Sequence, residues 1–170
     1  MQISLAKFNP SQLSQILAIE KESFSKDFRW SRREILRFIQ DSTTTCITAS
    51  VNNVVVGFSL FRRADRCVQI WDIVVDSENR RKGVGRSLME DMWRCMCSGR
   101  PRQRRLVAVV GYKPAGTLSF FKAMGFHAVG LIEDGVSPGV DAYSMSAEPG
   151  CESVYVDRLA EYFNSLTREF

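Results

Sequence analysis

The chain has 170 residues, of which 45% are hydrophobic and 25% charged, and its formal net charge is +4. This length and composition fit one soluble globular domain that can bury a substantial core. The mild positive charge suits an anionic ligand but does not by itself indicate nucleic-acid binding. No apolar run approaches the roughly 20 residues that span a membrane, and no signal peptide is evident. Five cysteines without a C-x-x-C pair indicate reduced thiols and no metal site, so we expect a cytoplasmic protein.

Two helices are predicted in the first 40 residues. Apolar and polar residues alternate over residues 2–8, which predicts a first strand before these helices. A helix is then expected to open at Pro10, with apolar residues at helical spacing. A second helix is expected after Ser31, which serves as its N-cap, with Glu34 completing a capping box.

A β-rich region follows these helices. Residues 44–51 and 54–61 are predicted strands, joined by Asn52 and Asn53. Because asparagine tolerates positive φ, this pair predicts a tight hairpin. A further strand is expected over residues 67–75.

The C-terminal half predicts the rest of a mixed α/β domain. A helix should begin at Pro114, where proline is tolerated, and end at Gly125. A loop bearing Gly135, Pro138 and Gly139 is expected between the last two strands. The three predicted strands of this half cover residues 106–110, 126–132 and 140–147.

Residues 148–170 form a separate amphipathic extension in this interpretation. After a break at Pro149-Gly150, apolar residues recur at helical spacing. They are Val154, Tyr155, Leu159, Tyr162, Phe163 and Leu166. We expect this helix to pack on its own domain or to form a homodimer, and we favour the homodimer.

Residues 80–86, Arg-Arg-Lys-Gly-Val-Gly-Arg, lie between the strand that ends at Val75 and a helical pattern that begins near Gly83. The first turn of a helix has unpaired backbone N–H groups and partial positive charge, which suit a phosphate. The third glycine of the dinucleotide pattern G-x-G-x-x-G is replaced by Leu88, and the ending of a P-loop is absent. The alternative is a helix start whose basic residues simply face solvent.

This stretch resembles the acetyl-CoA signature of the GCN5-related N-acetyltransferases, Gln/Arg-x-x-Gly-x-Gly/Ala. Arg80, Gly83 and Gly85 match it in place. Further segments resemble bacterial ribosomal-protein N-terminal-alanine acetyltransferases, in the same order along the chain: residues 18–24 with Trp30-Ser31, residues 118–126 and residues 141–145. The resemblance covers about residues 2–147, so we expect an acetyltransferase domain over 1–147 and the extension over 148–170.

The resemblance implies a central, mixed, mostly antiparallel sheet with helices on both faces. It implies acetyl-CoA as cofactor and an amine as acceptor, either a protein N-terminus or a small molecule. From the short apolar runs and the mild net charge, we expect no membrane or nucleic-acid partner. The cofactor would pair with backbone at the end of the central strand and bind the basic glycine turn. The implied cofactor-binding residues are Ile73, Val74, Val75, Arg80, Arg81, Lys82, Gly83, Val84, Gly85 and Arg86.

The catalytic positions depart from the family pattern. Val109 stands at the position of the glutamate base, and Phe121 at that of the tyrosine acid, or Phe120 if the register shifts by one. Pro114 stands where an asparagine often contacts the cofactor, and Gln69 where other members place a carboxylate or tyrosine. None of these side chains is a base or acid near neutral pH.

Other side chains are therefore candidates for proton transfer. We expect Asp72 to be the base, with Tyr112 and Tyr143 as further catalytic candidates and Glu133 and Asp141 as substitutes. Burial would raise the pKa of Asp72 into a useful range; the alternative is a purely structural aspartate. The second hypothesis for the whole chain is a non-catalytic acyl-CoA-binding interaction module.

Overall fold

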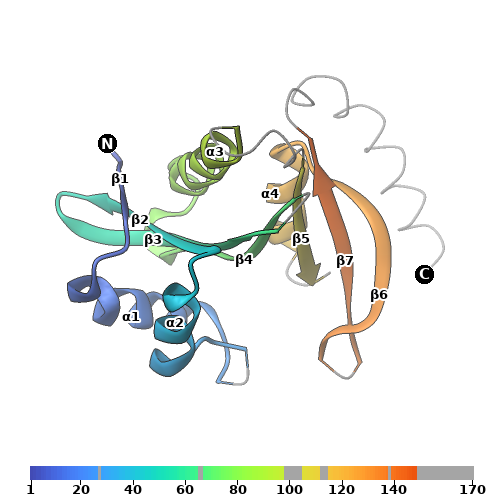
Figure 1. Cartoon of the computed structure of the whole chain (residues 1–170), viewed down its shortest axis with the longest axis horizontal. Helices are drawn as coiled ribbons and strands as arrows, with labels where there is room; N and C mark the ends of the chain where they lie inside the picture. The colour runs from blue at the N-terminus through green and yellow to red at the C-terminus, as the bar shows by residue number, and fades with distance from the viewer. Residues whose placement is uncertain (27, 65–66, 98–104, 112–114, 138, 149–170) are drawn as a thin grey trace.

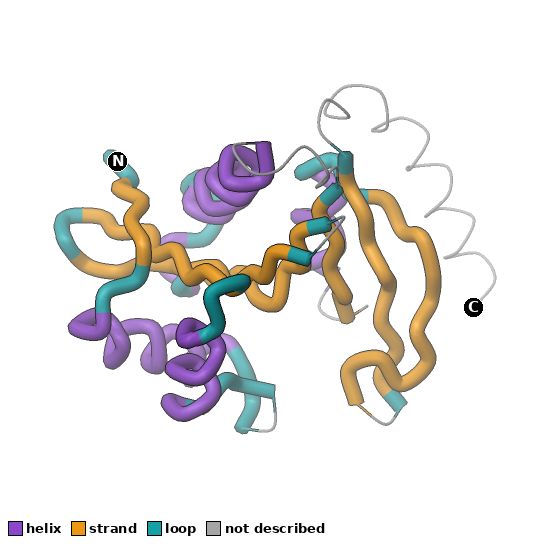
Figure 2. The backbone as a smooth tube through the Cα atoms, viewed as in Figure 1, coloured by secondary structure: helices purple, strands orange, loops and turns teal. Residues whose placement is uncertain are grey.

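The computed structural model describes residues 1–148, except for residues 27, 65–66, 98–104, 112–114 and 138. Helices and strands are both distributed along the chain, without strict alternation (Figure 2). In order they are β1 (Ser4–Lys7), a 3-10 turn (Pro10–Gln12), α1 (Leu13–Ser23), α2 (Arg32–Gln40), β2 (Thr44–Val51), β3 (Val54–Arg63), β4 (Val68–Val75), a 3-10 turn (Ser77–Asn79), α3 (Val84–Cys97), β5 (Leu106–Gly111), α4 (Ala115–Ala123), β6 (His127–Ser137) and β7 (Val140–Ala147).

The seven strands form one sheet in the order β1-β2-β3-β4-β5-β7-β6. Strands β4 and β5 are parallel, and the other neighbouring pairs are antiparallel. Helices cover both faces: α1 and α2 lie on one side of β2–β4, and α3 on the other (Figure 1). The predicted mixed, mostly antiparallel fold is therefore confirmed.

Local sequence signals produce the turns and caps as predicted. Ser31 Oγ accepts the backbone N–H of Glu34 (3.3 Å), and a Glu34 carboxylate oxygen accepts the backbone N–H of Ser31 (2.8 Å). Asn52 and Asn53 both have positive φ (50° and 65°), which closes the β2–β3 hairpin. Gly125 ends α4 at φ 85°.

The sheet separates two hydrophobic cores. The core on the α3 and α4 side contains fully buried residues such as Leu88, Met92 and Phe126. The core on the α1 and α2 side contains Ile16 and Ile35, both completely buried. The two faces of β4 therefore contribute to different cores, with Val68 and Ile70 in the first and Val74 in the second.

One strand boundary differs from the prediction. Strand β6 continues to Ser137, so Gly135 lies within a strand and not in the expected loop. A Cβ atom at Gly135 would lie 2.9 Å from the Ala142 side chain, so the close approach of β7 requires a glycine there.

Some predictions fall outside the described residues. These are the helical extension after residue 148, Pro114, Tyr112 and Pro138. Within the described residues, no helix is long and apolar enough to cross a membrane.

Candidate functional site

The site is built where β4 and β5 separate. Their parallel pairing extends only from Val68 to Ile70 on β4. Beyond Ile70, the residues up to Val75 pair with β3 on one side but have no described pairing with β5 on the other. The backbone of this half of β4 can therefore pair with an extended ligand lying between the two strands.

A β-bulge at Trp71 decides which side chains of β4 face the α1–α2 side of the sheet. Asp72 is opposite Leu60, and Ile70 is opposite Phe61, so Trp71 is the extra residue. Ile70 packs in the α3-side core, whereas Trp71 contacts a ring on α2, with centroids 5.5 Å apart. Trp71 and Asp72 are consequently both directed to the α1–α2 side, which simple alternation would not allow.

The turn before α3 has the geometry of an anion site. The carbonyl of Gly83 accepts the first helical bond, from the Ser87 backbone N–H (3.0 Å). The N–H groups of residues 84–86 precede that bond and point out of the helix start. Gly83 has φ 89° and Arg81 has φ 62°, so two left-handed residues shape the turn.

The two glycines of the turn serve different purposes. A Cβ atom at Gly83 would meet nothing within 4 Å, so its positive φ is what requires a glycine. A Cβ atom at Gly85 would lie 3.1 Å from a ring carbon of Phe120 on α4. Gly85 therefore lets α4 pack against the start of α3.

Arg80 holds this turn against its neighbours. Its Nε donates to the carbonyl oxygen of Val75 (2.9 Å), and its Nη2 donates to Ser23 Oγ at the end of α1 (3.3 Å). The other basic residues of the turn are exposed and remain available to a ligand: Arg81, Lys82 and Arg86. By contrast, the side chains of Val74 and Val84 are buried in the cores, so only their backbone can bind a cofactor.

Asp72 has a buried acidic neighbour that the sequence prediction missed. Glu20, on α1, is 0% exposed. Its Oε2 accepts the backbone N–H of Trp30 (3.1 Å), while its Oε1 has no hydrogen-bond partner in the described part of the chain. The carboxyl groups of Glu20 and Asp72 interact directly across the α1–β4 contact.

The two carboxyl groups favour holding a proton between them. Burial raises the pKa of Asp72 well above its usual value, and the charge and hydrogen bonding of Glu20 raise it further. Burial also raises the pKa of Glu20, against hydrogen bonds from Asp72 and Trp30 that lower it. Two close carboxylates disfavour double ionisation, so Asp72 keeps a proton that an exposed aspartate would lose.

The nearby thiol of Cys46 is chemically quiet. Burial, with a smaller contribution from the charge of Asp72, raises the pKa of Cys46 to about 12. A thiol with this pKa is protonated near neutral pH and is a poor nucleophile. Of the titratable side chains described at this end of β4, the carboxyl pair is therefore a better candidate for proton transfer than this thiol.

The remaining candidates lie elsewhere. Tyr143 packs against the α3-side core, on the opposite face of the sheet from Asp72. Asp141 accepts the backbone N–H of Asp134 (3.1 Å) within the β6–β7 hairpin, and Glu133 is exposed on the same hairpin. The structure does not bring these three residues together with Asp72.

The positions that depart from the family pattern are now placed. Phe121 is buried in a core of aromatic rings, 5.0 Å from the Phe126 centroid. Val109 is 57% exposed and shares the sheet face of Gln69, because Gln69 pairs with Val107 in the parallel register. An apolar side chain thus lies on the open face where the resemblance implies a base.

A model of the acetyltransferase (GNAT) family matches residues 13–126, about two thirds of the chain. The chain belongs to this family. The match includes α1, the bulged strand and the glycine turn, so family membership supports acyl transfer and coenzyme A binding. No curated protein sequence matches the chain.

Solved structures share the fold at low sequence identity. The chain is similar to the ribosomal-protein-S18-alanine N-acetyltransferase from Escherichia coli (19% identity, TM-score 0.71, covering 86% of this chain and 94% of that one). It is similar to Ard1 from Thermoplasma volcanium (19% identity, TM-score 0.75, covering 87% of this chain and 98% of that one). It is also similar to the PaiA N-acetyltransferase from Thermoplasma acidophilum in complex with coenzyme A (16% identity, TM-score 0.74, covering 87% of this chain and 99% of that one).

Proposed function

We propose that the protein is an acetyl-CoA-dependent N-acetyltransferase that acts on a primary amine, namely a protein N-terminus. The observation that carries this proposal is the combination of a helix start with free N–H groups and an adjacent unpaired strand edge in a chain of the GNAT family. Several similar solved structures are acetyltransferases by name, and two of them contain coenzyme A. These likenesses support the reaction class and leave the acceptor to experiment.

The residues of the turn fit a diphosphate. The N–H groups of residues 84–86 would donate to phosphate oxygens, and the positive end of the α3 dipole would favour their charge. Arg81, Lys82 and Arg86 are exposed around the same turn. The backbone of residues 71–75 would align the rest of an extended ligand toward the bulge. When bound there, acetyl-CoA supplies a thioester carbonyl that an amine can attack.

Asp72 would remove the proton from the acceptor ammonium. In the balanced reaction the amine nitrogen forms a bond to the acyl carbon, the carbon–sulfur bond breaks, and the thiolate takes a proton from Asp72 or from water. An ionised Asp72 is needed to start this sequence. Glu20 makes that ionised form more basic, because its own charge disfavours a second negative charge nearby.

The apolar residues Val109 and Phe121 favour one competing function, a GNAT domain that binds acyl-CoA without turnover. Incubation with acetyl-CoA and a panel of peptides and small amines separates the two functions, with thiol release and product mass as readouts. We expect turnover, and we expect Asp72→Asn to lower kcat by about 10²-fold or more with little change in CoA affinity. CoA binding without turnover of any amine would support the module, and normal turnover by Asp72→Asn would remove Asp72 from the mechanism.

A further inference from the structure

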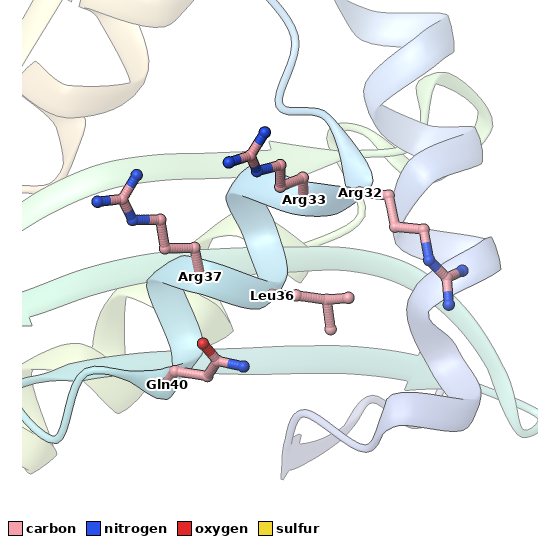
Figure 3. A pocket seen from close by; sticks show the side chains of 5 residues that line it. All are labelled: Arg32, Arg33, Leu36, Arg37 and Gln40. Carbon is pink, nitrogen blue, oxygen red and sulfur yellow. The ribbon is translucent and has the colours of Figure 1, made fainter.

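The outer face of α2 is strongly basic. Arg32, Arg33 and Arg37 are all exposed, and they line an open depression of about 720 Å³ together with Leu36 and Gln40. Arg33 and Arg37, one helical turn apart, extend to the same side of the helix, while Arg32 points the other way (Figure 3).

These arginines have no acidic partner within the described residues. The described ion pairs join Arg62 to Asp41 and Arg94 to Asp91, and none involves α2. The one acidic residue of α2, Glu34, uses its carboxylate to cap the helix. The positive charge of this face is therefore not neutralised locally, and its guanidinium groups have free donors for carboxylates.

An aromatic cluster joins this basic helix to the proposed reaction site. The Trp30 ring, just before α2, lies 5.4 Å from the Phe38 ring and 6.0 Å from the Trp71 ring. Trp71 is 50% exposed and directly precedes Asp72. A chain whose amine reaches Asp72 would thus pass a partly exposed tryptophan and then α2.

We propose that α2 is the docking surface for an acidic polypeptide segment that follows the acceptor amine. This inference rests on the proposed function, because it assumes a polypeptide acceptor. A helix is about 10 Å across and an extended chain advances about 3.3 Å per residue, so the arginines lie within reach of roughly the third to fifth acceptor residues. The acidic side chains Glu133, Asp134 and Asp141 belong to the β6–β7 hairpin at the far edge of the sheet, and they disfavour acidic segments there.

A short acidic peptide fits this surface better than a nucleic acid. The basic face is limited to one nine-residue helix, about 13 Å long, and the net charge of the chain is only +4. Duplex binding relies on many phosphate contacts spread along the backbone. Arg33 and Arg37, which extend to the same side of α2, match a few carboxylates on an extended peptide.

The test compares peptide acceptors that share an N-terminal residue and differ at positions three to five, with glutamate, glutamine or lysine there. We expect the glutamate peptide to have the lowest KM, by about three-fold for each arginine it engages, with kcat little changed and the advantage reduced by salt. Arg33→Glu and Arg37→Glu together should remove this preference or reverse it toward the lysine peptide. Lys7→Glu on exposed β1 makes the same charge change as either single substitution, Arg33→Glu or Arg37→Glu. It is the control for those single variants and should leave the ranking intact.

A binding measurement separates this inference from the proposed function. An N-terminally blocked acidic peptide, followed by fluorescence anisotropy on the full chain, should bind more tightly than its glutamine version and should lose that advantage in the double variant. This result without any turnover would contradict the proposed function but support the docking surface. Three results would overturn the inference. They are equal binding of all peptides, tighter binding of the lysine peptide, and tighter binding of an oligonucleotide that is lost in the double variant.

Discussion

At the scale of single residues, the protonation of Asp72 depends on a residue from another element. Glu20 lies on the apolar side of α1, where a carboxylate is costly unless it is paired or protonated. The pair resembles other close carboxyl pairs, in which mutual repulsion separates the two titrations. The consequence is that the pH dependence of the reaction should respond to a residue that need not touch the substrate.

The first prediction concerns this pH dependence. The base must be ionised, and the pKa of Asp72 is raised, so kcat/KM should increase as pH rises through that elevated pKa. Replacing Glu20 by glutamine removes the negative neighbour, so the increase should move to lower pH. Asp72→Asn should remove this limb of the profile. Initial rates across a pH series with saturating acetyl-CoA measure all three effects.

The acceptor amine also titrates, with a pKa of about 8 for a free N-terminus, and gives a rising limb of its own. Repeating the series with an acceptor of different amine pKa identifies which limb belongs to the enzyme. A rising limb that shifts with the pKa of the acceptor amine and is unchanged by Glu20→Gln and Asp72→Asn would contradict a role for the carboxyl pair.

At the scale of elements, the turn before α3 needs its two glycines for different reasons. Gly83 is needed for its positive φ, and Gly85 for the close packing of Phe120. Valine at both Gly83 and Gly85 should abolish CoA binding, because one change strains a left-handed residue and the other forces Phe120 from the helix start. Calorimetric titration with CoA measures the loss. Gly116→Ala in α4 is the control. Nothing lies within 4 Å of the added methyl group, so this variant should bind CoA with unchanged affinity. Unchanged affinity in the double valine variant, confirmed as folded by circular dichroism, would refute the assignment of the turn.

The elements that the sequence predicted well are those set by neighbouring residues. The Ser31–Glu34 capping box, the Asn52-Asn53 hairpin and the glycine end of α4 each depend on a few adjacent positions. Strand β6 was predicted too short because Gly135 suggests a loop, whereas contact with distant Ala142 is what requires a glycine there.

The candidate site was predictable only in part, for a similar reason. The glycine turn is a local motif, so the sequence alone predicts a helix start near Gly83, and the structure has that geometry, with positive φ at Gly83. The bulge at Trp71 and the contact between Asp72 and Glu20 arise only when β3 and α1 pack on β4. One signal was present: Glu20 continues the apolar spacing of Leu13 and Ile16 on α1, and a carboxylate at a core position suggests a function.

At the scale of the whole molecule, the sheet brings the turn before α3 and Asp72 to the same end of β4. The proposed reaction needs both of them. The two cores hold α3 against one face of β4 and α1 with α2 against the other. The turn that we propose to bind the diphosphate follows β4 after one short 3-10 turn, and Asp72 lies on β4 a few residues earlier. Splitting of β4 from β5 between them provides the route by which a ligand bound at one can reach the other.

The residues after 148 carry a prediction about assembly. The apolar stripe of that segment is too extensive to leave in water, and a lone helix of its length is marginal, so its order should come from packing. We propose that it pairs two protomers, and deletion of residues 150–170 should then shift the sedimentation profile from dimer to monomer with the fold intact. A monomeric full-length protein would contradict the dimer, and a truncated chain that fails to fold would indicate docking on its own domain.

The central claim is that acyl transfer takes place at the bulge of β4, between the α3 turn and Asp72. A crystal structure of the full-length protein with coenzyme A tests this most directly. The account predicts pyrophosphate oxygens within hydrogen-bond distance of the N–H groups of residues 84–86, and the thiol beside residues 71–73 with Asp72 as the nearest carboxyl group. Coenzyme A bound away from the α3 turn, or a thiol distant from Asp72, would contradict the account.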